Sequence, residues 1–245
     1  MTDIETLLAD YVPNQAGVEL LRETEVVLLV GVTGAGKGTI RKKMLETGEF
    51  HNLVTSVTRE PRYNNGILEQ DGVEYHFITQ EHALELLANG EYVETSPVHG
   101  RIYGVTVEEV RKAHDDKKIA ISDIDVQGVA RYKELAEEVT AIFLVPPSYE
   151  EWQRRVRQRY PSEDAFLEDW PNRRGSAIME LEKALSVPYY HFVINDDLDE
   201  AVDACLKIAR CHDVFVRKDD EVRLIVRDML ETIKREAAED REKEE

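Results

Sequence analysis

Cysteine is almost absent from this chain. Two cysteines, Cys205 and Cys211, are all that the 245 residues contain, so a disulfide framework and a cysteine-ligated zinc site are both excluded. No apolar run approaches the roughly 20 residues that a membrane-spanning helix needs. The amino-terminal sequence also lacks the basic-then-apolar pattern of a secretion signal. We therefore expect a cytoplasmic protein without a membrane partner.

Basic residues are scarce relative to acidic ones. Lys and Arg number 31 against 50 Asp and Glu, which gives a formal net charge of −19. Nucleic acids and anionic membranes bind surfaces with a surplus of cations, so this balance argues against a nucleic-acid partner. Hydrophobic residues make up 42% of the chain, which suffices for one large domain or for a core domain with an insert.

Short apolar runs alternate with stretches of helical character along most of the chain. The run over residues 25–30 is continuous, as expected of a strand that is buried on both faces of a parallel sheet. Similar runs occupy residues 118–123, 141–145 and 191–194. Helices are expected over residues 39–46, 127–138, 148–159, 174–186 and 198–211. The alternation predicts an α/β fold in which helices cover a parallel sheet.

Two segments interrupt this alternation. Residues 52–110 contain short β-like pieces and a turn-rich loop, and we expect them to form a small inserted β-rich domain. Residues 160–173 are polar and contain Pro161 and Pro171, and we expect them to form a mobile lid. The remaining parts are a core over residues 25–51 and 111–210, an N-terminal extension over residues 1–24, and an acidic helical extension over residues 211–245.

The C-terminal extension carries one apolar stripe. Its members follow helical spacing and are Val222, Ile225, Val226, Met229, Leu230 and Ile233. Such a stripe either packs on its own domain or joins two copies of the chain. A monomer and a homodimer therefore both stay open.

A glycine-rich turn follows the first predicted strand and fits a phosphate-binding loop. It begins at Gly31 and has the pattern G-x4-G-K, ending in Lys37-Gly38-Thr39. Glycines let backbone N–H groups approach a phosphate closely, the following helix adds a positive N-terminal dipole, and Lys37 adds a point charge. The alternative is a glycine-rich turn without a ligand. The predicted ATP contacts are Gly31, Thr33, Gly34, Ala35, Gly36, Lys37, Gly38 and Thr39.

The residue after the loop lysine departs from the commonest pattern. Ser or Thr usually stands there and its hydroxyl ligates Mg²⁺, but here the residue is Gly38 and Thr39 comes next. Mg²⁺ keeps several of its waters in proteins. We therefore expect Mg²⁺ to be held mostly by phosphate oxygens and water, with Thr39 as the nearest hydroxyl.

Together with this loop, several separate blocks resemble guanylate kinase in the right order. They are residues 31–39, 56–62, 71–77, 90–94, 103–104, 123–128, 146–148 and 195–196. The resemblance runs over roughly residues 25–210. It implies a P-loop fold with an inserted domain that binds a nucleoside monophosphate, and ATP-dependent phosphorylation of GMP, and of dGMP as well.

The resemblance assigns the acceptor phosphate to two arginines and two tyrosines. Arg59 and Arg62 lie three residues apart in a proline-stiffened segment, and two planar guanidinium groups can grip a phosphate by charge-assisted hydrogen bonds. The hydroxyls of Tyr75 and Tyr103 complete this group. The alternative is a solvated arginine pair and two tyrosines that pack in the core.

The resemblance also assigns contacts to the guanine base. Glu94 would accept hydrogen bonds from the ring N1–H and the exocyclic amine, a donor pair that adenine lacks. Thr55 would reach the guanine O6, and Asp125 would lie near the acceptor nucleotide. Val105 stands where the family usually has Ser or Thr, which weakens the case for strict guanine selectivity. Thr106 is the candidate for a replacement contact.

Six arginines cluster late in this acidic chain. Their positions are 154, 155, 157, 159, 173 and 174. The resemblance places Arg155, Arg159 and either Arg173 or Arg174 at the ATP phosphates as catalytic groups. It places Asn195 near the adenine ring and Asp123 on a water of Mg²⁺. The alternative is a solvated helix face that neighbouring acidic residues balance.

The implied reaction is in-line transfer of the γ-phosphoryl group of ATP to GMP. No general base is needed, because a phosphate monoester has a second pKa of about 6. Lys37, Arg59 and the lid arginines would neutralise charge and fix geometry. Two alternatives stay open: a kinase of the same fold with another acceptor, and a non-catalytic binding module, in which the phosphate loop is usually eroded.

Overall fold

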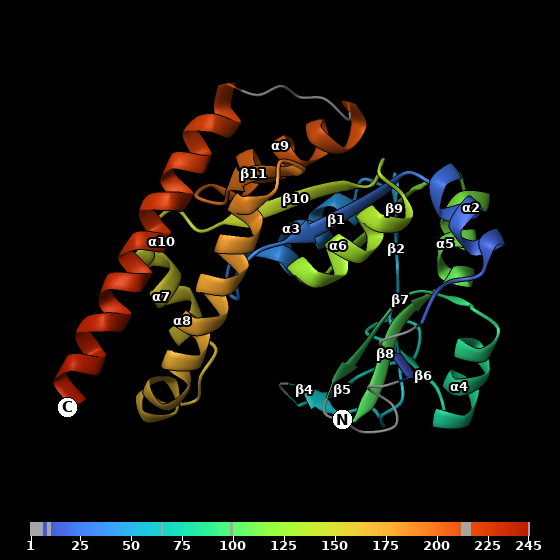
Figure 1. The fold of residues 1–245 in the computed structure, drawn as a ribbon, viewed down its shortest axis with the longest axis horizontal. Helices are drawn as coiled ribbons and strands as arrows, with labels where there is room; N and C mark the ends of the chain where they lie inside the picture. Colours follow the sequence, from blue (N-terminus) through green and yellow to red (C-terminus); the bar gives the residue numbers. More distant parts are fainter. Residues whose placement is uncertain (1–6, 9–10, 65, 99, 212–216, 245) are drawn as a thin grey trace. The chain divides into compact units, whose positions relative to one another are not determined.

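The computed structural model describes residues 7–8, 11–64, 66–98, 100–211 and 217–244 (Figure 1). By its internal contacts the chain divides into two compact units. The first unit comprises Met1–Val27, Thr47–Ser122 and Gln127–Val139. The second unit comprises Leu28–Glu46, Asp123–Val126 and Thr140–Glu245.

The first unit contains most of the short strands. Its elements are α2 (Gln15–Glu23), β2 (Phe50–Asn52), β3 (Ser56–Val57), β4 (Tyr63–Asn64), β5 (Ile67–Leu68), β6 (His76–Phe77), α4 (Gln80–Ala88), β7 (Tyr92–Val98), β8 (Arg101–Thr106) and α5 (Val107–Asp115). A four-stranded sheet has the order β6-β3-β8-β7, and β4 pairs with β5 in a separate hairpin. In the four-stranded sheet β3 is parallel to β6 and antiparallel to β8.

The second unit is mostly helical. Its elements are α3 (Lys37–Leu45), β10 (Thr140–Val145), α7 (Tyr149–Arg157), α8 (Glu163–Ser186), β11 (Tyr190–Ile194), α9 (Leu198–Cys211) and α10 (Arg217–Glu244). The strands β10 and β11 are parallel, with Ala141 opposite Tyr190. Helices α9 and α10 both pack against β11, and α9 also packs against α3.

A five-stranded sheet has the order β11-β10-β1-β9-β2. Its strands β1 (Val26–Val30) and β9 (Ile119–Asp123) each contain residues of both units, as does α6 (Val126–Leu135). Every residue of β1 and of β10 is buried, as the continuous apolar runs predicted. All four predicted core strands are confirmed. The fifth strand, β2, was not predicted because three residues of sequence Phe-His-Asn carry too little apolar pattern.

The segment over residues 52–110 contains more regular structure than its sequence predicted. Helix α4 and strand β8 were both missed. Helix α4 begins after Thr79, whose side chain accepts a hydrogen bond from the His82 backbone N–H at 3.1 Å. It buries Ala83 and Leu87, which lie four residues apart on one face.

Residues 163–173 are helical, so the predicted helix boundary at residue 174 is wrong. Helix α8 begins after Ser162, whose hydroxyl accepts from the Ala165 backbone N–H at 3.2 Å, and it continues through Pro171. A proline inside a helix removes one hydrogen bond. An aromatic cluster offsets this loss, because the Trp170 ring lies 4.8 Å from that of Trp152. The role of this segment as a lid stays a prediction.

The N-terminal segment packs into the first unit where it is described. Leu8 and Tyr11 are buried in a cluster with Ala83, Leu87, Tyr92 and Ile102. The Tyr11 hydroxyl donates to the Tyr92 carbonyl at 2.7 Å and accepts from the Tyr92 backbone N–H at 2.8 Å. Helix α2 packs against α5 and β7. Part of the predicted extension, which includes Ile4, lies outside the described residues.

The apolar stripe of α10 packs on its own unit. Val226, Met229, Leu230 and Ile233 are buried, and α10 packs against α8 and β11. Ile225 is 40% exposed at the edge of the stripe. This intramolecular packing accounts for four of the six stripe residues. Among the described residues, no helix has the length and apolar character that crossing a membrane requires.

We expect Ile233→Ala to destabilise the protein by roughly 2–4 kcal/mol, because it leaves a cavity under α10 where Ile233 is fully buried. The matched control is Ile225→Ala in the same helix, for which a change within about 0.5 kcal/mol is expected at a partly exposed site. Urea unfolding measures both. Equal stability of the two variants would show that α10 is not packed as described.

Candidate active site

The loop between β1 and α3 requires glycine at two positions. Gly31 and Gly36 have φ angles of 139° and 97°, in the region that favours glycine. A Cβ on Gly31 would lie 2.3 Å from the Leu144 carbonyl oxygen, and one on Gly36 would lie 2.2 Å from the Asn195 side-chain nitrogen. Both positions therefore need glycine, because the backbone has a positive φ and because Leu144 and Asn195 leave no room for a Cβ.

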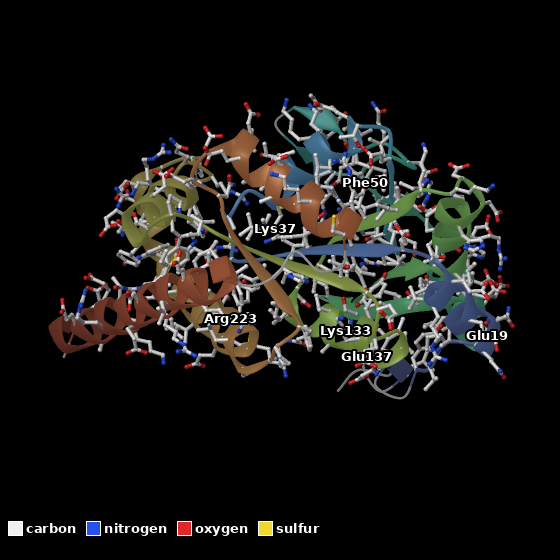
Figure 2. All side chains as sticks on the ribbon, turned by 90° about the horizontal axis from the view of Figure 1, so that it is seen from above. Glu19, Lys37, Phe50, Lys133, Glu137 and Arg223 are labelled. Carbon is white, nitrogen blue, oxygen red and sulfur yellow. The ribbon has the colours of Figure 1, made fainter. Side chains whose placement is uncertain are left out.

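Lys37, labelled in Figure 2, is the first residue of α3, and its side chain turns back onto the loop. Its Nζ donates to the Gly31 carbonyl and, at 3.4 Å, to the Val32 carbonyl. Burial lowers the pKa of Lys37, while the carboxylates of Glu180 and Asp123 counteract this effect. Two backbone carbonyls thus hold the ammonium group at the start of the loop.

A cavity of about 310 Å³ opens beside the loop. Its lining residues are Gly34, Gly36, Thr39, Arg155, Arg159, Asn195, Asp196 and Leu198. The Asn195 side chain donates to the Ala35 carbonyl at 2.8 Å, and Arg155 Nη1 donates to the Asn195 carbonyl at 2.9 Å. The structure therefore brings together the loop, two predicted arginines and Asn195 in one cavity of the second unit.

The two remaining candidate arginines do not line this cavity. Arg174 is 5% exposed, and its Nη1 lies 2.7 Å from a carboxylate oxygen of Asp240 on α10. Arg173 donates from Nε to the Tyr160 hydroxyl and to Asp169, both at 2.8 Å, and is partly exposed. Arg174 therefore joins α8 to α10, whereas Arg173 keeps access to solvent.

The residues predicted to hold Mg²⁺ fit a weakly protein-bound ion. Thr39 contributes a hydroxyl to the cavity, and Asp123 ends β9, where it forms an ion pair with Arg41. Within the described part of the chain, no group of three or more His, Cys, Asp or Glu residues could hold a metal. The donors are oxygens, which suit Mg²⁺, and they are too few for a cage made of protein alone.

Glu180 is a partly buried acid near Lys37 that the sequence did not lead us to predict. It lies on α8, and burial raises its pKa to about 7, an effect that Asp125 reinforces and Lys37 opposes. The signal was present in the sequence, because Glu180 shares a helix face with the apolar residues Ala177 and Ala184. Asp125 belongs to the second unit and is electrostatically coupled to Lys37 and Glu180.

Arg59 is the centre of a second cluster, which lies in the first unit. Its side chain is 7% exposed and donates to both carboxylate oxygens of Glu69, at 2.5 and 3.0 Å. Its Nε donates to the Tyr103 hydroxyl at 3.1 Å, and its guanidinium lies 4.9 Å from the centroid of the Tyr75 ring. The pairing with Glu69 raises the pKa of Arg59 and lowers that of Glu69, so both stay charged.

The same cluster includes Arg62 and the two tyrosine rings. The Tyr75 and Tyr103 rings meet edge to face, with centroids 5.9 Å apart. The Arg62 backbone N–H donates to Glu69 at 2.9 Å, and its side chain is exposed. The structure thus brings together Arg59, Arg62, Tyr75 and Tyr103, and it adds Glu69, which the sequence analysis did not single out.

The strands β7 and β8 bring Glu94 to the sheet face that carries Tyr103. Glu94 is paired with Val105, and Ser96 is paired with Tyr103. Paired residues of an antiparallel ladder point to the same face, and alternate residues of one strand share a face. Glu94, Tyr103 and Val105 therefore lie on one face of the four-stranded sheet.

Thr55 and Thr106 fall on opposite faces of this sheet. Ser56 is paired with Gly104, so the preceding Thr55 points to the face of Tyr103 and Val105. Thr106 follows Val105 and points away from that face. Its hydroxyl accepts from the Glu109 backbone N–H at 3.4 Å and caps α5. Thr106 therefore does not supply the hydroxyl that Val105 lacks.

We expect Glu180→Gln to stabilise the protein at pH 8. Glu180 has a folded pKa of about 7 against an ordinary value of 4.5, so between these values only the folded state carries the proton. The contribution of Glu180 to the free energy of unfolding is therefore greatest at low pH, and it is lost as the pH rises through 7. The variant should exceed wild type by on the order of 1–3 kcal/mol at pH 8 and match it below pH 4.5.

Urea unfolding across this pH range measures the effect. The matched control is Glu168→Gln, an exposed position on the same helix, whose stability should follow wild type at every pH. Parallel curves for Glu180→Gln and wild type would show that folding does not raise the pKa of Glu180.

Comparisons with other proteins agree with this arrangement. The family model described as guanylate kinase matches residues 23–210. The guanylate kinase of Clostridium perfringens (strain SM101 / Type A) is 33% identical over 207 residues, which cover 80% of this chain and 92% of that protein. That of Myxococcus xanthus (strain DK1622) is 34% identical over 177 residues, which cover 72% and 81%.

A solved structure is similar as well. The crystal structure of guanylate kinase from Anaplasma phagocytophilum matches with a TM-score of 0.56 and 27% identity, over 79% of this chain and 88% of that one. This match agrees with the predicted α/β fold, and the family model covers more than half of the chain. The chain belongs to the guanylate kinase family.

Proposed function

We propose that this chain is an ATP-dependent guanylate kinase, which transfers the γ-phosphoryl group of ATP to GMP and releases ADP and GDP. One observation carries the proposal. A complete phosphate loop with Lys37 occurs in the same chain as an arginine and tyrosine cluster on the sheet face that also carries Glu94. The first feature suits a triphosphate, and the second suits a guanine monophosphate.

The second unit would bind ATP. The loop amides and Lys37 would face the phosphates, and Arg155 and Arg159 line the same 310 Å³ cavity as the loop residues Gly34 and Gly36. Asn195 would lie near the adenine. Arg173 is the better candidate for a further phosphate contact, because Arg174 is engaged with Asp240.

The first unit would bind the acceptor nucleotide. Arg59 and Arg62 would hold its phosphate together with the tyrosine hydroxyls, and Glu94 would accept the two adjacent guanine donors. Thr55 lies on the same sheet face as Val105. Asp125 is the one proposed acceptor contact in the second unit.

Catalysis would consist of positioning and charge neutralisation. The acceptor phosphate is largely deprotonated at neutral pH, so the chain has no proton to remove before transfer. Lys37, Arg59 and the cavity arginines would lower the repulsion between two polyanions and align them in line. When bound, Mg²⁺ neutralises phosphate charge, and Thr39 and water held by Asp123 would hold it.

A non-catalytic binding module is the less favoured alternative, because the loop glycines and Lys37 are all present. A kinase with another acceptor is the second alternative, and Val105 is the residue that favours it. The cytoplasmic location, and the choice between a monomer and a homodimer, stay predictions.

We expect Lys37→Ala and Arg59→Ala to change different kinetic constants. Loss of Lys37 should lower kcat by at least about 100-fold, because it removes charge that stabilises the transferring phosphoryl group. Loss of Arg59 should raise the KM for GMP by about 10- to 100-fold and leave the KM for ATP within twofold. A coupled ADP-release assay measures both. Lys43→Ala, 46% exposed on α3, is the control and should behave as wild type.

An acceptor panel tests the substrate class. ADP release with GMP, dGMP, IMP, AMP, UMP and a sugar phosphate should be high for the two guanine nucleotides and low for AMP, UMP and the sugar phosphate. IMP offers one of the two donors that Glu94 would accept, so Glu94→Gln should reduce the preference for GMP over IMP by roughly 10-fold. An unchanged ratio would exclude Glu94 from the base contact.

A further inference from the structure

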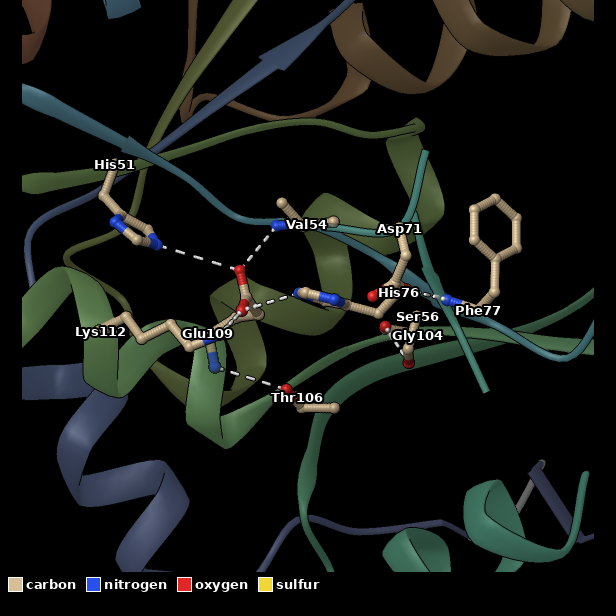
Figure 3. A network of polar contacts seen from close by, with 10 residues as sticks. All are labelled: His51, Val54, Ser56, Asp71, His76, Phe77, Gly104, Thr106, Glu109 and Lys112. Carbon is tan, nitrogen blue, oxygen red and sulfur yellow. Dashed lines mark hydrogen bonds and ion pairs between the residues drawn. The ribbon is translucent and has the colours of Figure 1, made fainter. Parts of the chain in front are cut away.

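A buried carboxylate lies between α5 and the strands of the first unit. Glu109 is 2% exposed. Its carboxylate accepts from the Val54 backbone N–H at 3.0 Å and from the side chain of Lys112, and it lies 3.1 Å from His76 Nε2 and 3.9 Å from His51 Nε2 (Figure 3). One residue on α5 therefore makes polar contacts with two other segments of the unit, residues 51–54 and β6.

These contacts keep the group ionised inside the protein. Burial alone would raise the pKa of Glu109, but hydrogen bonds from Lys112, the Val54 amide and His76 outweigh burial and hold the pKa below its ordinary value. A buried charge is costly unless donors of this kind satisfy it. The donors depend on the carboxylate in turn, because a buried backbone N–H such as that of Val54 needs an acceptor.

The segments that Glu109 joins both lead into the proposed acceptor site. Val54 directly precedes Thr55, and His76 directly follows Tyr75. Glu109 itself lies on α5, which follows β8 and therefore Tyr103. Thr55 and Tyr75 are thus the direct chain neighbours of residues that contact the Glu109 carboxylate, and Tyr103 lies six residues before Glu109.

The carboxylate of Glu109 adjoins an open volume on the side of β6. A cavity of about 610 Å³ lies there, and its lining includes His76 from β6 and Thr106, Glu109 and Lys112 around α5. His76 and Glu109 both line this cavity, so the hydrogen bond between them lies at its wall. On its other side α5 packs against β2, and there the Val54 N–H donates to the same carboxylate. Directional hydrogen bonds to Glu109 therefore join both segments to α5.

We propose that Glu109 is a positioning residue for the acceptor site: its carboxylate fixes the start of β3 and the strand β6 against α5, and so holds Thr55 and Tyr75 where they bind the acceptor nucleotide. Glu109 does not touch the nucleotide. This inference rests on the proposed function.

The test is Glu109→Gln, compared with Glu108→Gln. The glutamine keeps the size of the side chain and an acceptor for the Val54 amide, but it loses the charge and presents an NH₂ group to His76 or Lys112. We expect the KM for GMP to rise about 10-fold and the KM for ATP to stay within twofold. Glu108, 65% exposed and one residue earlier on α5, should tolerate the same change with unaltered kinetics.

A second variant serves if Glu109→Gln does not fold. His76→Phe keeps an aromatic ring, removes one partner of the carboxylate and changes a residue that is 29% exposed. It should raise the KM for GMP about threefold to tenfold, again without a matching change for ATP. The inference is overturned if a folded variant changes both KM values together, or neither.

The same assays distinguish an error in the proposed kinase activity from an error in the role of Glu109. If the wild-type chain releases no ADP with GMP, the proposed function is wrong and the positioning role is overturned with it. If the wild-type chain is active and Glu109→Gln leaves the KM for GMP unchanged, only the role of Glu109 is overturned.

Discussion

Three arginines predicted to touch phosphates are each paired with a carboxylate of their own unit. Arg59 pairs with Glu69, Arg155 with Glu151, and Arg173 with Asp169. Guanidinium groups that lie close together repel one another, and an anion beside each one lowers that cost. The pairs fix the arginines in place without leaving the charge unbalanced. A chain with a net charge of −19 can in this way keep cationic sites for anionic substrates.

The sequence predicted the parts of the fold that follow from local patterns. Four core strands were identified because their apolar runs are continuous, and the phosphate loop was identified because its glycines and Lys37 have fixed spacing. The start of helix α8 was predicted incorrectly, because Pro171 disfavours a helix in the local sequence. The packing of Trp170 against Trp152, which favours the helix, is a tertiary contact.

Side-chain partners were harder to predict than elements. The sequence could not separate Arg173 from Arg174, because the choice depends on Asp240, which lies 66 residues further along the chain. Thr106 was a plausible base contact until the register of β8 turned it to the opposite face. Glu109 was missed because its burial arises from tertiary packing. Glu180 was missed although it shares a helix face with Ala177 and Ala184.

Arg59 is paired with Glu69 in this structure, and this pairing affects which anions the Arg59 cluster would bind. Glu69 already serves as the counterion of Arg59. The binding free energy that a phosphate gains from Arg59 is therefore only the difference between its attraction to Arg59 and that of Glu69. A group with two negative charges can displace or share that counterion more readily than one with a single charge. At the proposed acceptor site, Glu69 would therefore favour a phosphate group with two negative charges over an anion with one.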